Sequence, residues 1–131
     1  MNKLDEEDRG SIDYDGLMRA NLARVFGEPD AGRRTEAIRE LGLEDALLYE
    51  PHASAKGHAA ISEAVTALLA SLPRDFVIRA AGPAVGHHGI GRLQWRSGPP
   101  NGPAAVAGMD VAHFERDRIH SLYFFLGPTA A

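Results

Sequence analysis

The carboxylate with the most unusual surroundings in this sequence is Asp110, which lies inside the segment VAGMDVAHF. Residues of a strand face alternate sides, and both sides of this segment are mostly apolar, so Asp110 is expected to be buried whichever side faces inward. A buried carboxylate must be paired, hydrogen-bonded or protonated. Two interpretations follow. Asp110 is either an acid in a pocket or a structural group paired with an arginine such as Arg79, Arg92 or Arg96.

Glu50 is the second candidate, because it ends the apolar run ALLYE directly before Pro51. The alternative is a solvated loop acid, since glutamate is usually exposed. Together, Glu50 and Asp110 would supply a pocket with two carboxyl groups from separate elements of the fold. In an apolar pocket one carboxyl group can stay ionised as a general base while the other is held protonated as a hydrogen-bond donor. The pair therefore predicts acid–base chemistry that needs no cofactor.

The other polar residues form no recognised catalytic pattern. The six histidines match no metal-ligand spacing, so no metal site is expected; they are His52, His58, His87, His88, His113 and His120. By strand alternation His120 shares a face with Leu122 and Phe124, which makes it either a pocket histidine or a core histidine. A nucleophile elbow, a phosphate-binding loop and a Ser-His-Asp arrangement are all absent from the sequence.

Composition excludes several classes of protein. The 131 residues include no cysteine, which rules out disulfides, thiolate metal sites and a cysteine nucleophile. With 14 Lys+Arg and 18 Asp+Glu the net charge is −4, which argues against a partner bound through nucleic-acid phosphates. Residues 1–50 carry most of the acids, and only five acids serve residues 51–131. The apolar runs are too short to span a membrane, and a soluble cytoplasmic protein is expected.

Periodicity predicts the elements that position these groups. Apolar residues recur at helical spacing in the first half of the chain, and alternation follows Pro73. The predicted helices cover 14–27, 31–41 and 58–72, and the predicted strands cover 46–51, 75–80, 90–98, 104–116 and 118–127. Helices that precede an antiparallel meander indicate an α+β fold, a cone of three helices on one curved sheet with a pocket at its open end. Residues 1–12 are expected to be a flexible tail and 13–131 a single domain.

The inward faces of these elements predict an apolar pocket wall. It consists of Leu22, Phe26, Leu93, Trp95, Phe114, His120, Leu122 and Phe124. The connection after Ser97 does not fix which side of the predicted strand 90–98 faces inward. If the other side faced inward, Arg92 and Arg96 would enter the pocket and favour an anionic ligand. If Phe124 faces the pocket, Tyr123 and Phe125 form an aromatic patch on the outer sheet face, which predicts a homodimer through that face.

Three segments together resemble the nuclear-transport-factor-2-like (NTF2-like) superfamily, and within it the SnoaL-like and ketosteroid-isomerase-like proteins. They are LEDALLYEP (43–51), KGHAAISEAV (56–65) and GMDVAHFERDRIHSLYFFLG (108–127). The resemblance covers about residues 13–127 and implies the cone fold. It is less informative about activity, because this fold hosts isomerases, cyclases, hydrolases, dehydratases and non-catalytic modules.

The resemblance also implies roles for particular residues. Ketosteroid isomerases carry a general-base aspartate before a proline, a place that Glu50 occupies here. They carry a protonated aspartate on a strand, four residues before a phenylalanine, which Asp110 and Phe114 match; this enzyme is a standard example of a neutral carboxylic acid used as a donor. Their second oxyanion donor, a helix-one tyrosine, falls near Asn21 or Leu22 in this chain.

These observations give two hypotheses of different classes. The first is a cofactor-free enzyme, isomerase-like or cyclase-like, in which Glu50 takes a proton next to a carbonyl group and Asp110 stabilises the oxyanion on a small hydrophobic substrate. The second is a non-catalytic ligand-binding or dimerisation module, which would follow if Glu50 faced solvent and an arginine occupied Asp110. Epoxide hydrolysis is weaker, since the sequence shows no Asp-Arg-Asp cluster.

Overall fold

The first helical segment begins where the sequence predicts it. In a computed structural model, which describes residues 12–127, α2 spans Tyr14–Asn21 and Asp13 caps it by accepting a hydrogen bond from Gly16 N at 3.0 Å. The helix continues as a π-helical turn, η1, over Leu22–Phe26. This wider turn buries both its first and its last residue. The predicted tail falls outside the described residues apart from residue 12.

Two further helices follow. α3 spans Ala31–Leu41 and is capped by Asp30, whose carboxylate accepts a backbone hydrogen bond at 2.9 Å. It ends at Gly42, as the sequence predicts, and there the chain becomes extended and enters the sheet directly. α4 spans His58–Ala70 and follows Gly57, whose φ of 91° lies in a region that glycine adopts without strain.

The strands form one curved, unclosed sheet. Their bounds are β1 Gly42–Glu50, β2 Ala53–Lys56, β3 Val77–Ala80, β4 Val85–His87, β5 Ile90–Gly98, β6 Val106–Glu115 and β7 Arg118–Gly127. The order across the sheet is β2-β1-β7-β6-β5-β3, and β4 pairs with the other half of β5. Only β1 and β7 pair in parallel. The sequence did not predict β2 and β4, which are short and show no apolar alternation.

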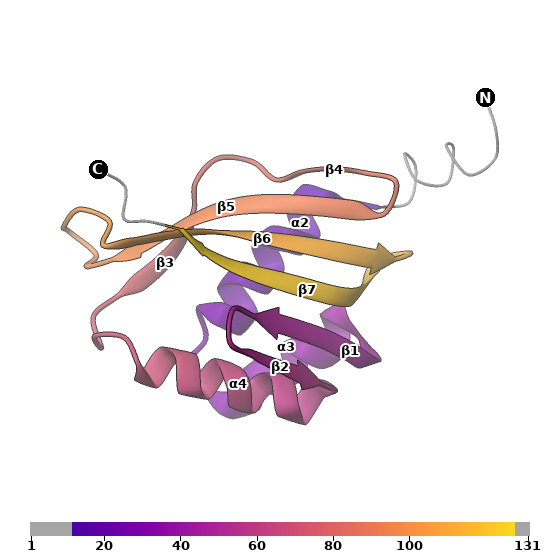
Figure 1. Ribbon diagram of the computed structural model, residues 1–131, viewed down its shortest axis with the longest axis horizontal. Helices are drawn as coiled ribbons and strands as arrows, with labels where there is room; N and C mark the ends of the chain where they lie inside the picture. Colours follow the sequence, from indigo (N-terminus) through magenta and orange to yellow (C-terminus); the bar gives the residue numbers. More distant parts are fainter. Residues whose placement is uncertain (1–11, 128–131) are drawn as a thin grey trace.

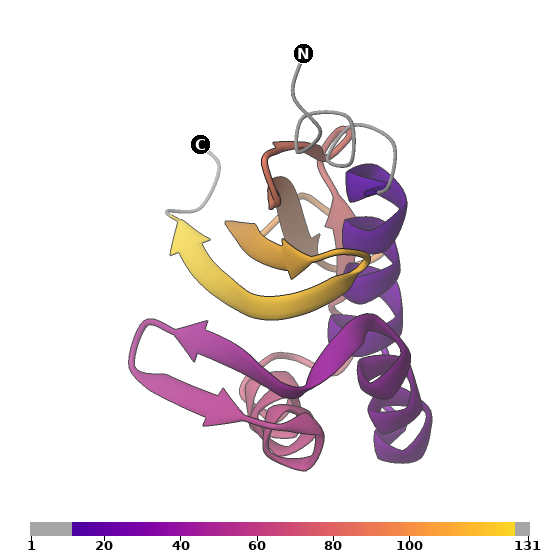
Figure 2. The same cartoon turned by 90° about the vertical axis from the view of Figure 1, so that its right-hand side faces the viewer.

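The helices lie against one face of this sheet, as Figures 1 and 2 show, with α4 beside the β1–β2 hairpin. We call this helix-covered face the inner face. Strand alternation places Asp110 and Phe114 on it, as predicted. It also places Leu93 and Trp95 inward, at 1% and 2% exposure, and leaves Arg92 and Arg96 on the outer face. The predicted α+β cone is therefore confirmed, and the facing that would turn the arginines inward is wrong.

One predicted facing on β7 is also wrong. The register of β6 and β7 shifts between His113 and Phe114, so that these two residues pair with Ser121 and Ile119 and skip His120. This bulge changes which residues of β7 face inward. As a result the His120 ring lies against the ring of His113, at 4.9 Å between centroids, instead of sharing the face of the inward aromatic residues.

Candidate functional site

Asp110 is buried and has no cationic partner. Its residue is 1% exposed, and Trp95 Nε1 donates a hydrogen bond to its Oδ1 at 3.0 Å. Within residues 12–127 no arginine or lysine pairs with it, because Arg92 and Arg96 point to the opposite face of the sheet. The pKa of Asp110 is raised from 3.8 to about 7, because the effect of burial outweighs the opposing effect of the indole hydrogen bond. A carboxyl group in this state is partly protonated at neutral pH, so the interpretation of a structural ion pair is wrong.

Gly108 makes the contact between the indole and Asp110 possible. Trp95 lies directly across from Gly108 in the β5–β6 register, and Asp110 is the next inward residue along β6. A Cβ atom at Gly108 would overlap both the Trp95 ring and the main-chain carbonyl of Phe125. The missing side chain lets the indole lie flat over β6, with its N–H reaching the carboxyl group.

Glu50 and Asp110 lie in one row across the inner face. β1 and β7 pair in parallel as far as Tyr49 opposite Tyr123, and continuing this register by one residue would set Glu50 beside Phe124. The register of β6 and β7 places Asp110 opposite the same Phe124. Neighbouring strands lie about 4.8 Å apart, so the backbones of the two acids are separated by roughly 10 Å. The two carboxylates that the sequence singled out therefore lie on the strands that flank β7, on the same side of the sheet as Phe124.

Glu50 lies in more open surroundings than Asp110. It is half-buried and borders a shallow hollow of about 420 Å³ together with Pro51, His52, Ala53 and Leu126. Partial burial raises the pKa of the Glu50 carboxyl above its usual range. A higher pKa makes a carboxylate a stronger base, provided that it remains ionised at the working pH.

An apolar cavity of about 170 Å³ lies next to this row. Its walls come from the end of α4, the α4–β3 connection and the inner face of the sheet, and include Phe26, Trp95 and Phe124. The Phe124 ring stacks on both of the others, at 5.2 Å from Phe26 and 5.1 Å from Trp95. Leu126 borders this cavity and the Glu50 hollow alike. The two spaces are thus neighbours with Leu126 between them, while Asp110 lies behind the indole and lines neither.

Only some of the residues that were predicted to form the pocket wall line this cavity. Phe26, Trp95 and Phe124 line it; Leu22, Leu93 and Phe114 are buried in the core; Leu122 borders a separate space of about 30 Å³. His120 lies elsewhere, for the reason given above. The sequence analysis missed the opposite wall, which Leu68, Leu72, Phe76 and Ile78 supply. The apolar spacing along the predicted helix 58–72 could have indicated this wall, because the last leucines of that segment line the cavity.

Neither Asn21 nor Tyr14 forms a hydrogen bond with Asp110 among the described residues. Asn21 is 7% exposed and faces the 30 Å³ space without a hydrogen bond to Asp110. Tyr14 lies at the far end of α2, where its hydroxyl accepts a hydrogen bond from Gly89 N at 2.8 Å and its ring meets Phe114 edge-on. The part of the chain that the structure covers also contains no group of three or more potential metal ligands, and none of its helices is long and apolar enough to span a membrane.

No protein-family model and no curated protein matches this sequence. Solved structures share its fold. A SnoaL-like family protein from Agrobacterium tumefaciens, described as a candidate isomerase, has a TM-score of 0.79 and 24% identity over 87% of this chain and 97% of that chain. A candidate polyketide cyclase from Sinorhizobium meliloti has a TM-score of 0.65 and 14% identity over 83% and 93%. An NTF2-like protein of unknown function from Cytophaga hutchinsonii has a TM-score of 0.60 and 14% identity over 92% of this chain and 95% of that chain. The architecture and these likenesses agree, and the protein has the NTF2-like fold.

Proposed function

We propose that the protein is a cofactor-free acid–base enzyme acting on a small hydrophobic carbonyl compound, by isomerase-like or cyclase-like proton transfer. The observation that carries this proposal is the row of Glu50, Phe124 and Asp110 beside an apolar cavity. Its two acids have different surroundings, one half-open and one buried without a cation. Two carboxyl groups whose environments separate their protonation states are suited to divide the roles of base and acid.

In the proposed reaction Glu50 removes a proton from the carbon next to the carbonyl group. The C–H electron pair moves into the carbonyl group and forms an enolate, and protonated Asp110 donates a hydrogen bond to its oxygen. The proton on Glu50 then returns to another carbon in an isomerisation. In a cyclisation the enolate carbon attacks a second carbonyl group, and the alkoxide that forms takes the proton from Glu50. No electron acceptor and no metal takes part in either sequence, so both balance without a cofactor.

Trp95 must move for Asp110 to meet a substrate. Trp95 donates a hydrogen bond to the carboxyl group and itself lines the cavity, whereas Asp110 does not. Substrate binding would therefore turn the indole away and exchange its hydrogen bond for one to the oxyanion. The Glu50 side of the row needs no such change, because that carboxylate already borders open space.

The test is proton exchange next to a carbonyl group, because it requires no knowledge of the natural substrate. Hydrophobic cyclic ketones in D₂O are expected to gain deuterium at the α-carbon faster with the protein than with buffer, measured by NMR. Glu50→Gln should reduce this rate by about 10²–10⁴-fold, since general-base catalysis typically contributes that much. The matched control is Glu44→Gln, an exposed position on the same strand. Equal exchange with all three proteins would overturn the proposal.

A second candidate function is a non-catalytic binding module. The observation that favours it is that Asp110 borders neither the apolar cavity nor the Glu50 hollow. A module of this kind would hold an apolar molecule against Trp95 and Phe124 without proton transfer. Binding of a hydrophobic ketone with no exchange of its α-protons would support the module and exclude the enzyme.

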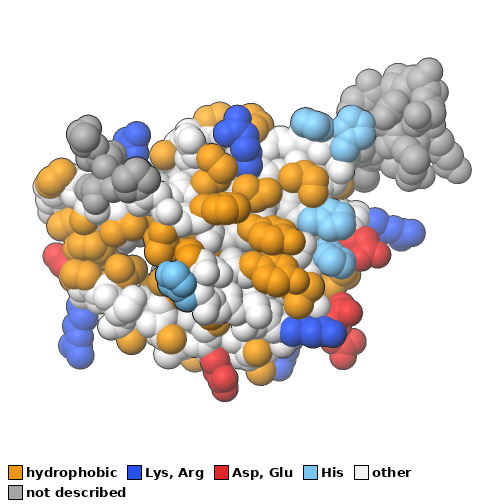
Figure 3. Space-filling view, in the orientation of Figure 1, with side chains coloured by type: hydrophobic (Ala, Val, Ile, Leu, Met, Phe, Trp, Pro, Cys, Tyr) orange, Lys and Arg blue, Asp and Glu red, His pale blue; other side chains and the backbone are white. Residues whose placement is uncertain are grey.

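We also propose that a second copy of the chain covers the outer sheet face over β1 and β7. Figure 3 shows this face with a broad band of hydrophobic side chains. Tyr123 and Phe125 are 43% and 53% exposed there, and Tyr49 stacks on Tyr123 at 4.8 Å. Exposed aromatic patches of this kind mark interaction surfaces. Light scattering should give the mass of a dimer, and Phe125→Glu should give that of a monomer. A monomeric wild-type protein at high concentration would contradict this proposal.

A further inference from the structure

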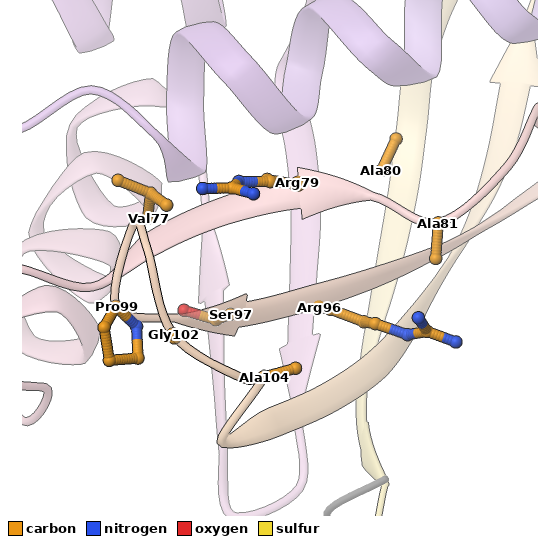
Figure 4. Close-up of a pocket in the computed structure, with 10 residues that line it drawn as sticks. Val77, Arg79, Ala80, Ala81, Arg96, Ser97, Pro99, Gly102 and Ala104 are labelled. Atoms are coloured by element: carbon orange, nitrogen blue, oxygen red, sulfur yellow. The ribbon is translucent and has the colours of Figure 1, made fainter.

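A second hollow, of about 280 Å³, lies on the opposite face of the sheet from Trp95. β3 and β5 form its floor and the loop 99–104 forms one wall (Figure 4). The residues that matter for its chemistry are Arg79, Arg96, Ala81 and Ala104. β3 is the edge strand at the opposite end of the sheet from β2 and β1. The hollow is therefore separated from the aromatic patch over β1 and β7.

The hollow contains two positive charges that no acid neutralises. Arg79 and Arg96 are directly opposite each other in the antiparallel pairing of β3 and β5, an arrangement in which like charges destabilise a sheet. Neither forms an ion pair within residues 12–127. The sequence has no Asp or Glu between Asp75 and Asp110, which covers β3, β4, β5 and the loop that walls the hollow. The positive charges of Arg79 and Arg96 are therefore left for an anionic ligand to neutralise.

The two arginines are held at different ends of the hollow. Figure 4 shows the Arg79 side chain extended toward Val77 and the Arg96 side chain extended the opposite way, toward the end formed by Ala81. Arg79 Nη2 donates a hydrogen bond to the carbonyl oxygen of Pro100 at 2.7 Å, which fixes the guanidinium against the loop. Most donors of both guanidinium groups remain available, since each carries five.

The wall and the middle of the hollow are small and apolar. A hydrogen bond from Ala105 N to Ser97 O at 2.9 Å closes the loop back onto β5. Main-chain atoms of the loop pack so closely on Gly98 that a Cβ atom there would meet them at 2.7–3.1 Å. Between the charged ends the lining includes Gly98, Gly102 and Ala104. This arrangement places a short apolar segment between two cationic ends.

We propose that this hollow binds a small linear dicarboxylate, with one carboxylate on Arg79, the other on Arg96, and the methylene chain over the small residues between them. A guanidinium group binds a carboxylate through parallel hydrogen bonds. A single phosphate would instead require guanidinium groups that converge on one point, whereas these two diverge. The site is separate from the Glu50–Asp110 row, which lies on the inner face over β1, β7 and β6, and does not depend on the function proposed for that row.

The experiment is calorimetric titration with glutarate at constant ionic strength, with monomethyl glutarate and inorganic phosphate as comparison ligands. The wild-type protein is expected to bind glutarate at least tenfold more tightly than either, because only glutarate has a carboxylate for each arginine. Arg79→Gln and Arg96→Gln should each lower the affinity for glutarate at least tenfold. Arg92→Gln is the matched control, since Arg92 lies on the same face of β5 but outside the hollow.

Thermal unfolding supplies a measurement that does not depend on the choice of ligand. Without ligand, Arg96→Gln should have a higher Tm than the wild type, because it removes the opposed charge. Glutarate should raise the Tm of the wild type and of Arg92→Gln, but not of Arg96→Gln. The proposal is overturned if monomethyl glutarate binds as tightly as glutarate, if phosphate binds more tightly, or if Arg92→Gln loses as much affinity as Arg96→Gln.

Discussion

Asp110→Asn is expected to stabilise the folded protein above pH 7 and to leave its stability nearly unchanged near pH 4. The pKa of Asp110 is about 7 in the folded state and 3.8 ordinarily, so between these values the folded protein binds more protons than the unfolded chain. Stability therefore falls as pH rises from about 4 to about 7, and stays reduced above that. A shift of about three pKa units corresponds to about 4 kcal/mol. Asparagine avoids this loss and retains an oxygen that accepts the hydrogen bond from Trp95.

The measurement is Tm against pH for both proteins. The difference between them should grow from near zero at pH 4 to an increase on the order of 10 °C for Asp110→Asn at pH 8. Asp117→Asn is the control for the removal of a carboxylate in general, because Asp117 is exposed in the β6–β7 turn. Parallel pH profiles for Asp110→Asn and the wild type would mean that Asp110 has an ordinary pKa, and would also remove the acid from the proposed mechanism.

Phe124→Ala is expected to lower the free energy of unfolding by about 3–5 kcal/mol, the usual range for removing a buried aromatic ring. Phe124 is 4% exposed, and its ring stacks on both Phe26 and Trp95. It also lies on the strand between those of Glu50 and Asp110, so its removal would leave a gap on this side of the sheet. Urea unfolding followed by circular dichroism measures the loss.

The adjacent residue provides the matched control. Phe125 has the same side chain but faces outward and is 53% exposed. Phe125→Ala should change stability by less than about 1 kcal/mol in the monomer. Any larger loss should depend on protein concentration, because it would come from the proposed dimer contact. Similar losses for both substitutions at every concentration would contradict the assignment of opposite faces.

Local patterns in the sequence were sufficient for much of this fold. Alternation predicted that Asp110 is buried, because its strand is apolar on both sides and no choice of face exposes it. Helical spacing predicted both bounds of α3 and the start of α2. These features depend on residues close in sequence, for which the sequence is a direct guide.

Features set by contacts between distant strands could not be predicted. The row of Glu50, Phe124 and Asp110 depends on the parallel pairing of β1 with β7, which no local pattern specifies. The hydrogen bond from Trp95 to Asp110 depends on the register that sets the indole over Gly108. The facing of His120 was predicted wrongly because one residue skipped in a ladder reverses alternation, and nothing in the sequence marks where that occurs.

The chain has one tryptophan, and it is the residue that contacts Asp110 and borders the apolar cavity. Its tryptophan fluorescence therefore comes from a single place in the molecule. Ionisation of the carboxyl group next to the indole N–H alters the electric field across the ring, and an occupant of the cavity alters the polarity at its face. The protein thus carries an optical reporter at the centre of its candidate site, which follows protonation and occupancy without a label.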